Sequence, residues 1–154
     1  MLKAFEKYKV LNGRELRARY EVAVETYNKT INVEGQLMVL MANRYILPAA
    51  LEYLKSVGQS VAAVKAAGAR SFEGKKLLDR VVKLTDTLKR NADALADALA
   101  HSGGDSLKHA KHFRDKVIPA MVALRSTADT LETIVPHGAW MLPTYREMLF
   151  VSKA

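Results

Sequence analysis

The first third of the chain has apolar and aromatic residues at intervals of three, four or seven positions. These residues are Leu16, Tyr20, Val24, Tyr27, Ile31, Met38, Met41 and Tyr45. Such intervals place the side chains on one face of a helix. Asn12 is suited to cap this helix, because Glu15 stands three residues further on and completes a capping box. The pattern therefore predicts a long helix over residues 13–57, which Gly58 ends.

The predicted first helix is too long for a compact domain. At 1.5 Å per residue it would span roughly 65 Å, whereas a compact domain of this chain length is only about 40 Å across. The helix must therefore extend beyond the core or bend. Pro48 has no amide hydrogen, and its ring clashes with the preceding helical turn. We expect the bend or break near Pro48.

A second long helix is predicted after a short helical piece. Residues 59–67 are helix-forming but few, and residues 68–74 read as a connection, so residues 59–101 are expected to form more than one helix. The main helix has a near-heptad pattern of apolar residues. The residues of this pattern are Leu77, Val81, Leu84, Leu88, Leu95 and Leu99, with Asn91 or Ala92 in the gap. Residues 102–104, Ser-Gly-Gly, end this helix.

The third helix is predicted over residues 105–135. Asp105 or Ser106 can cap it, and apolar residues recur along it at helical spacing. The recurring positions are Leu107, Ala110, Phe113 or Arg114, Val117, Met121, Leu124, Ala128, Leu131 and Val135. Pro119 lies inside the pattern and predicts a kink, and Pro136 ends the helix.

The segment 136–154 differs from the helices, since it has no long helical period. It contains Trp140, Tyr145 and Phe150 together with two prolines. Three large aromatic side chains are costly to leave in water, so we expect this tail to pack back onto the helices, in a groove lined by the first one. Thr144 is placed to cap one short helical turn within the tail.

The fold class expected from these elements is all-α. It is an antiparallel bundle of three long helices with short helical segments and a docked C-terminal tail. We expect a single domain over residues 1–154, in which residues 1–12 form a linker or short lead-in.

Composition narrows the classes of function. The chain has 154 residues and no cysteine, which excludes disulfides, thiolate metal sites and a cysteine nucleophile. Its net charge is +8, but basic and acidic residues are interleaved, and a nucleic-acid interface would more often be a block of one sign. The longest run without a charged side chain, residues 133–145, is too short to cross a membrane, and no apolar signal segment follows Met1. We expect a cytoplasmic protein that binds neither nucleic acid nor membranes.

Three histidines could carry chemistry, but they have a simpler interpretation. His101, His109 and His112 are close in sequence, and the last two share a helical face. Nearby lysines disfavour a metal ion, so solvated surface histidines are expected. His109 could also accept a phosphoryl group between Lys108 and Lys111, although this signal is generic.

Carboxylates and a glycine-rich segment complete the candidates. Glu34 and Glu52 are too far apart on the first helix to act as a catalytic pair, and each is expected to pair with a base across the bundle. Residues 68–76 superficially resemble a phosphate-binding loop, but the glycine spacing and Lys76 do not fit one. We therefore expect no catalytic, cofactor-binding or metal-binding residue in this chain, only a helical bundle with a docking tail.

Three segments, in this order, carry a resemblance to a known family. They are residues 11–22 (LNGRELRARYEV), residues 27–34 with 42–50 (YNKTINVE and ANRYILPAA), and residues 140–150 (WMLPTYREMLF). Together they resemble the C-terminal helical region of type III glutamine synthetases, the large bacterial and cyanobacterial members of that enzyme family. The similarity extends over essentially the whole chain, although residues 58–126 match only as helix.

The resemblance implies a role within a larger enzyme. Type III glutamine synthetases join ammonia to glutamate with ATP and Mg or Mn, and they assemble as stacked hexameric rings whose catalytic residues lie upstream of this region. The chain would then be an excised, non-catalytic C-terminal domain that contributes to stability, assembly or regulation. Its expected partners are the rest of the parent enzyme, on which the tail could dock instead, and the oligomer neighbours. The alternative is a stand-alone basic helical-bundle binding module.

Overall fold

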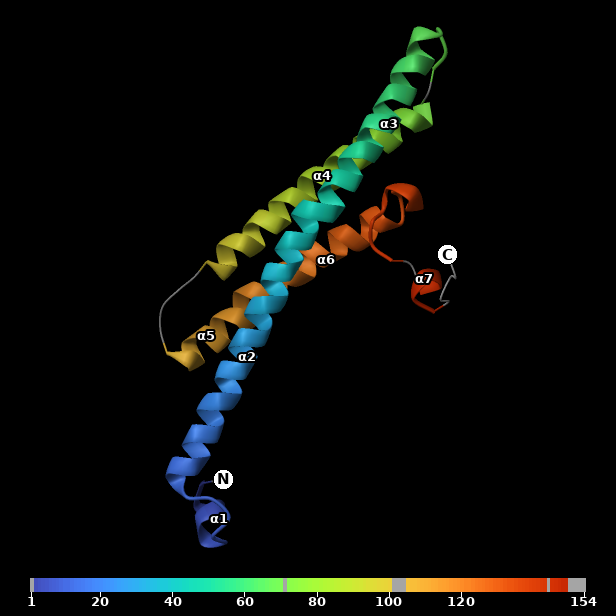
Figure 1. The fold of residues 1–154 in the computed structure, drawn as a ribbon. Helices are drawn as coiled ribbons and strands as arrows, with labels where there is room; N and C mark the ends of the chain where they lie inside the picture. The colour runs from blue at the N-terminus through green and yellow to red at the C-terminus, as the bar shows by residue number, and fades with distance from the viewer. Residues whose placement is uncertain (1, 71, 101–104, 144, 150–154) are drawn as a thin grey trace.

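The computed structural model describes residues 2–70, 72–100, 105–143 and 145–149, and the regular elements of this part are all helical (Figure 1). The α-helices are α1 (Leu2–Lys7), α2 (Gly13–Met41), α3 (Leu47–Ala66), α4 (Phe72–Leu99), α5 (Ser106–His112), α6 (Ile118–Glu132) and α7 (Tyr145–Leu149). Two π-helical turns, η1 (Ala42–Ile46) and η2 (Phe113–Val117), and one 3₁₀ turn, η3 (His137–Ala139), complete the order. The predicted all-α class is confirmed.

Three long helical segments form the predicted antiparallel bundle. The first, called the rod below, is the unbroken succession α2–η1–α3 over residues 13–66. Helix α4 runs back along it, and α5–η2–α6 returns in the direction of the rod (Figure 1). Helix α4 packs against both the rod and α6, while α5 lies against α2. Long segments that follow each other in the sequence therefore also pack against each other in space.

The start of the rod follows the predicted capping box. The Asn12 side-chain oxygen accepts a hydrogen bond from the Glu15 amide at 2.9 Å, and the Glu15 carboxylate accepts one from the Asn12 amide at 2.8 Å. Helix α5 is capped similarly by Asp105, whose carboxylate accepts from the Lys108 amide at 2.8 Å. Both caps satisfy amide groups that the first helical turn leaves unpaired.

The end of the rod lies beyond the predicted position. Gly58 does not end the helix but lies inside α3, where a Cβ would be 3.8 Å from the side chain of Leu78. Packing against α4 here outweighs the cost of one interior glycine, which is about 1 kcal/mol. The helix ends instead at Gly68, whose φ of +76° is left-handed and whose amide donates to the Lys65 carbonyl at 3.1 Å. The following connection is shorter than residues 68–74, because α4 begins at Phe72.

Both interior prolines follow a widened helical turn. The Leu47 amide donates to the Ala42 carbonyl, five residues back, and Pro48 comes next. The Ile118 amide donates to the Phe113 carbonyl in the same way, immediately before Pro119. A π turn moves carbonyls away from the ring of a following proline, so the helix continues without a break. The disturbance predicted near Pro48 is therefore a change of hydrogen bonding, and the rod keeps nearly the same direction past it (Figure 1).

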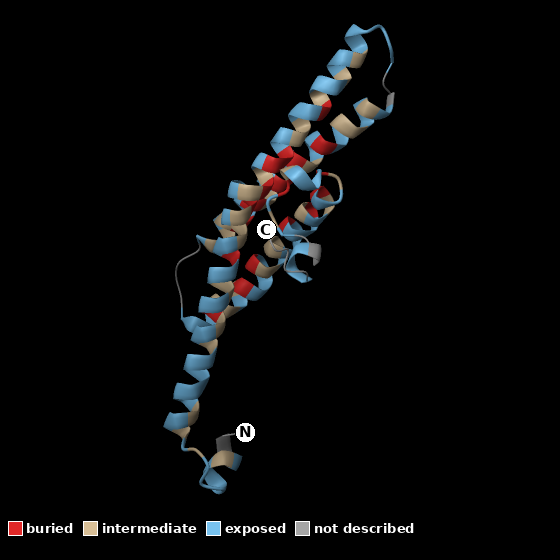
Figure 2. Cartoon of the chain, turned by 45° about the vertical axis from the view of Figure 1, so that its right-hand side comes forward, coloured by how far each residue is buried: buried red, intermediate tan, exposed pale blue. Residues whose placement is uncertain are grey.

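The core lies where the three long segments meet. Its largest fully buried side chains are Leu88, Leu95 and Val81 of α4, Leu124 and Leu131 of α6, and Val117 of η2. They belong to the predicted apolar stripes, and Ala92 fills the gap in the α4 stripe. Buried residues gather at mid-length, whereas both ends of the rod are mostly exposed (Figure 2). The core thus lies around the middle of the rod, while α4 also packs against α3 and the start of α2 extends past α5 (Figure 1).

Candidate functional site

Of the three aromatic residues predicted to dock the tail, Trp140 is the one whose side-chain surroundings the structure describes. It follows η3, and its amide donates to the His137 carbonyl at 3.0 Å. The side chain is only 7% exposed, and its indole N–H, also buried, has no hydrogen-bond partner in the described part of the chain. Trp140 lines a cavity of about 390 Å³ between the rod and α6. Other residues around this cavity are Met38, Ala42 and Ile46 of the rod and Leu124 and Ala128 of α6.

The other two predicted tail residues are not placed in this way. Tyr145 begins α7, but its side chain is outside the described part of the structure, and Thr144 and Phe150 lie outside the described residues altogether. The exposed residues of α7 include Met148 and Leu149, at 59% and 73%. The structure therefore brings Trp140 to the rod, and the docking role of the three aromatic residues as a set stays a prediction.

The N-terminal part of α2 extends beyond the bundle. This is one of the two outcomes expected of so long a helix, which had either to extend beyond the core or to bend. We call residues 13–24 the arm; it projects past the end of α5 and carries the short helix α1 near its tip (Figures 1 and 2). Leu16, Tyr20 and Val24 continue the core-facing stripe onto the arm, but the Tyr20 side chain is 53% exposed. Leu16 and Val24 are half-buried, so Tyr20 is the residue of this stripe that is left largely uncovered.

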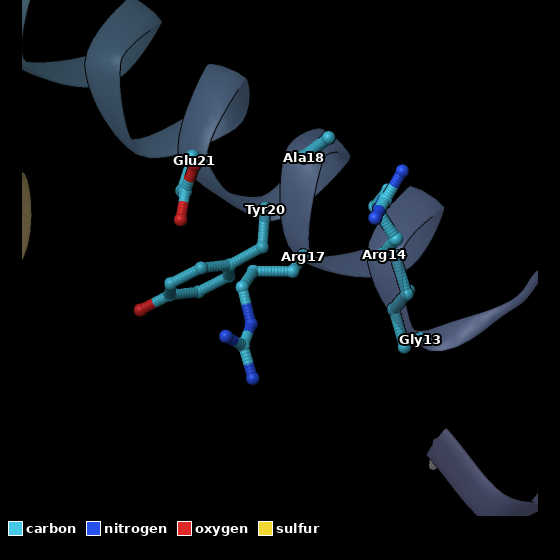
Figure 3. A pocket seen from close by; sticks show the side chains of 7 residues that line it. Gly13, Arg14, Arg17, Ala18, Tyr20 and Glu21 are labelled. Atoms are coloured by element: carbon cyan, nitrogen blue, oxygen red, sulfur yellow. The ribbon is translucent and has the colours of Figure 1, made fainter.

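Cationic side chains border the stripe of the arm. A hollow of about 740 Å³ is lined by Arg14, Arg17 and Tyr20 together with smaller neighbours. In Figure 3 the side chains of Arg17 and Tyr20 extend from the same side of the helix. A second hollow of about 390 Å³ lies between the arm and the start of α5, from Tyr20 to Leu107. Arginine and tyrosine are typical of residues that bind a protein partner.

A second apolar stripe on α2 is absent from the sequence predictions. Val33, Leu37 and Leu40 are 63%, 53% and 47% exposed, and their intervals of four and three place them on one helical face. We call these three residues the outer face. The spacing alone could have indicated it, but the stronger pattern of the core-facing residues on the same helix obscured it.

Two of the three candidate histidines, His109 and His112, pack against neighbouring groups of the bundle. The His112 Nε2 atom lies 2.9 Å from the Ala98 carbonyl oxygen, and the rings of His109 and His112 both meet Phe113 edge-on at 6.2 Å. Both histidines are half-buried, so the expectation of solvated side chains is wrong for them. His101 lies outside the described residues. Within the described ranges, no three His, Cys, Asp or Glu side chains come together as metal ligands.

The carboxylates of the rod do not pair across the bundle. Glu34 and Glu52 are exposed, and neither forms an ion pair with a described residue, so the cross-bundle pairs expected for them are wrong. Ion pairs form locally instead, since polar residues on one exposed helix face reach each other more easily than a neighbouring helix. Glu25 and Lys29 are 2.7 Å apart, and the hydrogen bond and charge of Lys29 lower the pKa of Glu25.

The glycine-rich segment contains no phosphate loop. Gly68 ends α3, while Glu73 and Gly74 already belong to α4, and Lys76 pairs with Glu73 at 3.0 Å. No helix of the described residues is long and apolar enough to cross a membrane. The described side chains therefore form a core and exposed surfaces. The candidate histidines and carboxylates among them do not come together at one site.

Comparisons with known proteins show which proteins the chain is similar to. Residues 1–65 match the family model of the glutamine synthetase C-terminal domain. The chain is 28% identical over 158 residues to the type-3 glutamine synthetase of Dictyostelium discoideum, which covers 97% of this chain and 22% of that protein. It is 25% identical to a glutamine synthetase of Butyrivibrio fibrisolvens and 24% identical to one of Bacteroides fragilis, over 95% and 92% of this chain and 21% of each relative. The chain thus spans about a fifth of the length of these curated relatives, and the resemblance seen in the sequence is confirmed.

Proposed function

We propose that the chain is a non-catalytic helical domain of a glutamine synthetase, because residues 1–65 match the family model of the glutamine synthetase C-terminal domain. Its function is to attach to the rest of the enzyme and to its oligomer neighbours in the cytoplasm, and so to support assembly. The ATP- and Mg- or Mn-dependent joining of glutamate and ammonia belongs to parts of the enzyme outside residues 1–154. The described side chains do not fit a metal site, so no step of that reaction is placed on them.

The observation that carries this proposal is the arm. Its stripe of Leu16, Tyr20 and Val24 continues a core pattern past the end of the core, next to Arg14 and Arg17. Tyr20, which is 53% exposed between the half-buried Leu16 and Val24, favours a partner that covers it. Buried tyrosine and arginine anchors contribute strongly to such interfaces.

The family assignment supports the same surface. The matched segment, residues 1–65, comprises α1 and almost the whole rod, and it leaves out α4 and α6. The rod holds the arm away from the bundle, so the arm can reach another part of the enzyme while the core stays intact. Attachment through the arm therefore requires no rearrangement of the bundle.

The test uses the full-length enzyme expressed from its natural reading frame. We expect Leu16→Asp with Tyr20→Asp to reduce the assembled fraction, measured by analytical ultracentrifugation, because two charges enter the covered stripe. Val122→Asp is the matched control, since Val122 is 63% exposed on α6 and should assemble as the wild type does. Residues 1–154 alone should form no more glutamine from glutamate, ammonia and ATP than a heat-killed sample.

Three outcomes would contradict the proposal. Assembly that the arm variant leaves unchanged would exclude the arm as the attachment surface. A reading frame that encodes residues 1–154 alone would favour the stand-alone basic helical-bundle binding module, for which only the net charge of +8 argues. Glutamine formation by the 154-residue chain would show that it is catalytic after all.

A further inference from the structure

Helix α2 is apolar on two sides. One side, with Ile31, Met38 and Ala42, faces α4 and the core. The outer face, Val33, Leu37 and Leu40, points away from that core and is 47–63% exposed at each residue. A helix needs one apolar stripe to join a bundle, and an exposed second stripe indicates a second packing partner.

Positive side chains stand at both ends of the outer face. Lys29 precedes Val33 by four residues and Arg44 follows Leu40 by four, so both share its row along the helix. The side chain of Lys29 is 75% exposed and bonds to Glu25, which lies one turn further from the outer face. The Arg44 guanidinium lies 5.8 Å from the Tyr45 ring centre, and Arg44 is exposed. The two cations are roughly 20 Å apart along the helix.

The remaining borders of the outer face are mostly uncharged. Gln36 and Asn32 lie on one side, where their side chains form a hydrogen bond at 3.4 Å. Glu34 lies on the other side, about 100° around the helix from Val33. The charges next to the two ends of the apolar row are therefore both positive, and Glu25, one turn beyond Lys29, pairs with it.

We propose that the outer face binds an amphipathic helix whose apolar residues lie between two carboxylates, in the part of the enzyme outside residues 1–154. The inference rests on the proposed function and names the partner chemistry at a second surface of the same domain. Aliphatic residues at intervals of four and three form the ridge that packs into the groove of another helix. Carboxylates at the two ends of that helix would complement Lys29 and Arg44.

Charge and chain length favour this occupant over a second copy of the chain. Two copies would bring together surfaces with a net charge of +8 each and would place Lys29 and Arg44 near their own counterparts. The relatives have about four-fifths of their length outside the matched region, which leaves ample sequence for such a helix. The outer face, like the arm, lies inside the segment that matches the family model.

Photo-crosslinking in the full-length enzyme tests the inference. The benzophenone amino acid p-benzoylphenylalanine replaces Leu37, Tyr20 or Val122 in three separate proteins, and mass spectrometry identifies the crosslinked peptides. We expect the Leu37 probe to label a helix outside residues 1–154 with carboxylates at both ends of its apolar stripe. The Val122 probe is the control for an equally exposed position and should label no such helix.

The same experiment separates the two proposals. Crosslinks from Tyr20 without any from Leu37 would overturn the inference and leave attachment through the arm standing. Crosslinks from Leu37 to residues 1–154 of another copy would overturn it in favour of self-association. Crosslinks from neither Tyr20 nor Leu37 would overturn both proposals.

Charge reversal tests the partner chemistry. In the Leu37 probe protein, Lys29→Glu with Arg44→Glu should lower the crosslink yield about tenfold, because both end contacts become repulsive. The matched control is Lys83→Glu with Arg90→Glu on α4, which changes the net charge equally and should leave the yield unchanged. Equal losses in the two variants would show a response to net charge alone and would overturn the inference.

Discussion

Replacing Trp140 with alanine removes the aromatic ring that closes the tail onto the rod. The ring is 7% exposed and lies beside a cavity of about 390 Å³, which the replacement would enlarge. Removal of a buried tryptophan costs about 3–5 kcal/mol in free energy of unfolding, including the cavity that remains. We expect the full cost here, because the neighbours Ala42 and Leu124 are themselves buried in the core cluster.

Trp140→Phe should behave very differently, for a reason specific to this site. The indole N–H is buried without a partner in the described residues, and such a donor costs about 1–3 kcal/mol. Phenylalanine removes that cost and loses part of the buried apolar area, worth about 1 kcal/mol. The gain equals or exceeds the loss, so the free energy of unfolding should stay the same or rise by up to about 2 kcal/mol.

Urea unfolding of the 154-residue chain, followed by far-ultraviolet circular dichroism, measures both variants. With a slope of about 2 kcal/mol per molar urea, the alanine variant should unfold at a midpoint lower by about 2 M. Met141→Ala is the control, since Met141 is adjacent and 75% exposed. A midpoint for Trp140→Ala equal to that of the control would refute internal docking. A large loss in Trp140→Phe would show that the indole N–H does have a partner.

Three further changes test other features of the fold. Gly68→Ala should cost about 1–2 kcal/mol in urea unfolding, because φ is +76° and a Cβ would meet no atom within 4 Å, so the cost is that of the backbone alone. Gly35→Val should cost about 1–3 kcal/mol more than Gly35→Ala, since an added Cβ lies 2.9 Å from a Leu99 methyl group that can yield to alanine but not to a branched side chain. Lys29→Met should raise the pKa of Glu25 towards its ordinary value in an NMR titration. Because Lys29 lowers that pKa, the pair stabilises α2 above the ordinary value of 4.5, and the difference between variant and wild type should vanish in acid.

Periodicity was sufficient to predict the long helices and the residues that join them. The α4 stripe contains Val81, Leu88 and Leu95, all fully buried, as its near-heptad spacing predicted. The capping box at Asn12 was equally readable, because it depends on residues three apart. Signals of this kind are local, and local signals can be read from one sequence.

Features that depend on contacts between helices were harder to predict. Gly58 reads as a helix end, yet contact with α4 carries the rod on to Ala66. Whether Glu34 and Glu52 would pair with a base depended on which helices face them, and residue spacing alone does not give this. The outer face was readable from its spacing, but that the face is exposed became clear only once the other side of α2 was known to be buried. The family resemblance, carried by short segments, needed no knowledge of these contacts.

The unbroken rod has a mechanical consequence. Helices of 29, 5 and 20 residues in succession make a rod of roughly 80 Å, against which α4 packs along both α2 and α3. A displacement of the arm would therefore pass along the rod to the part of it that packs against α4. The π turn before Pro48 is the most compliant point of the rod, because its widened hydrogen-bonded ring replaces the regular helical one. Torque applied at the arm would reach the contact with α4 without unfolding the core.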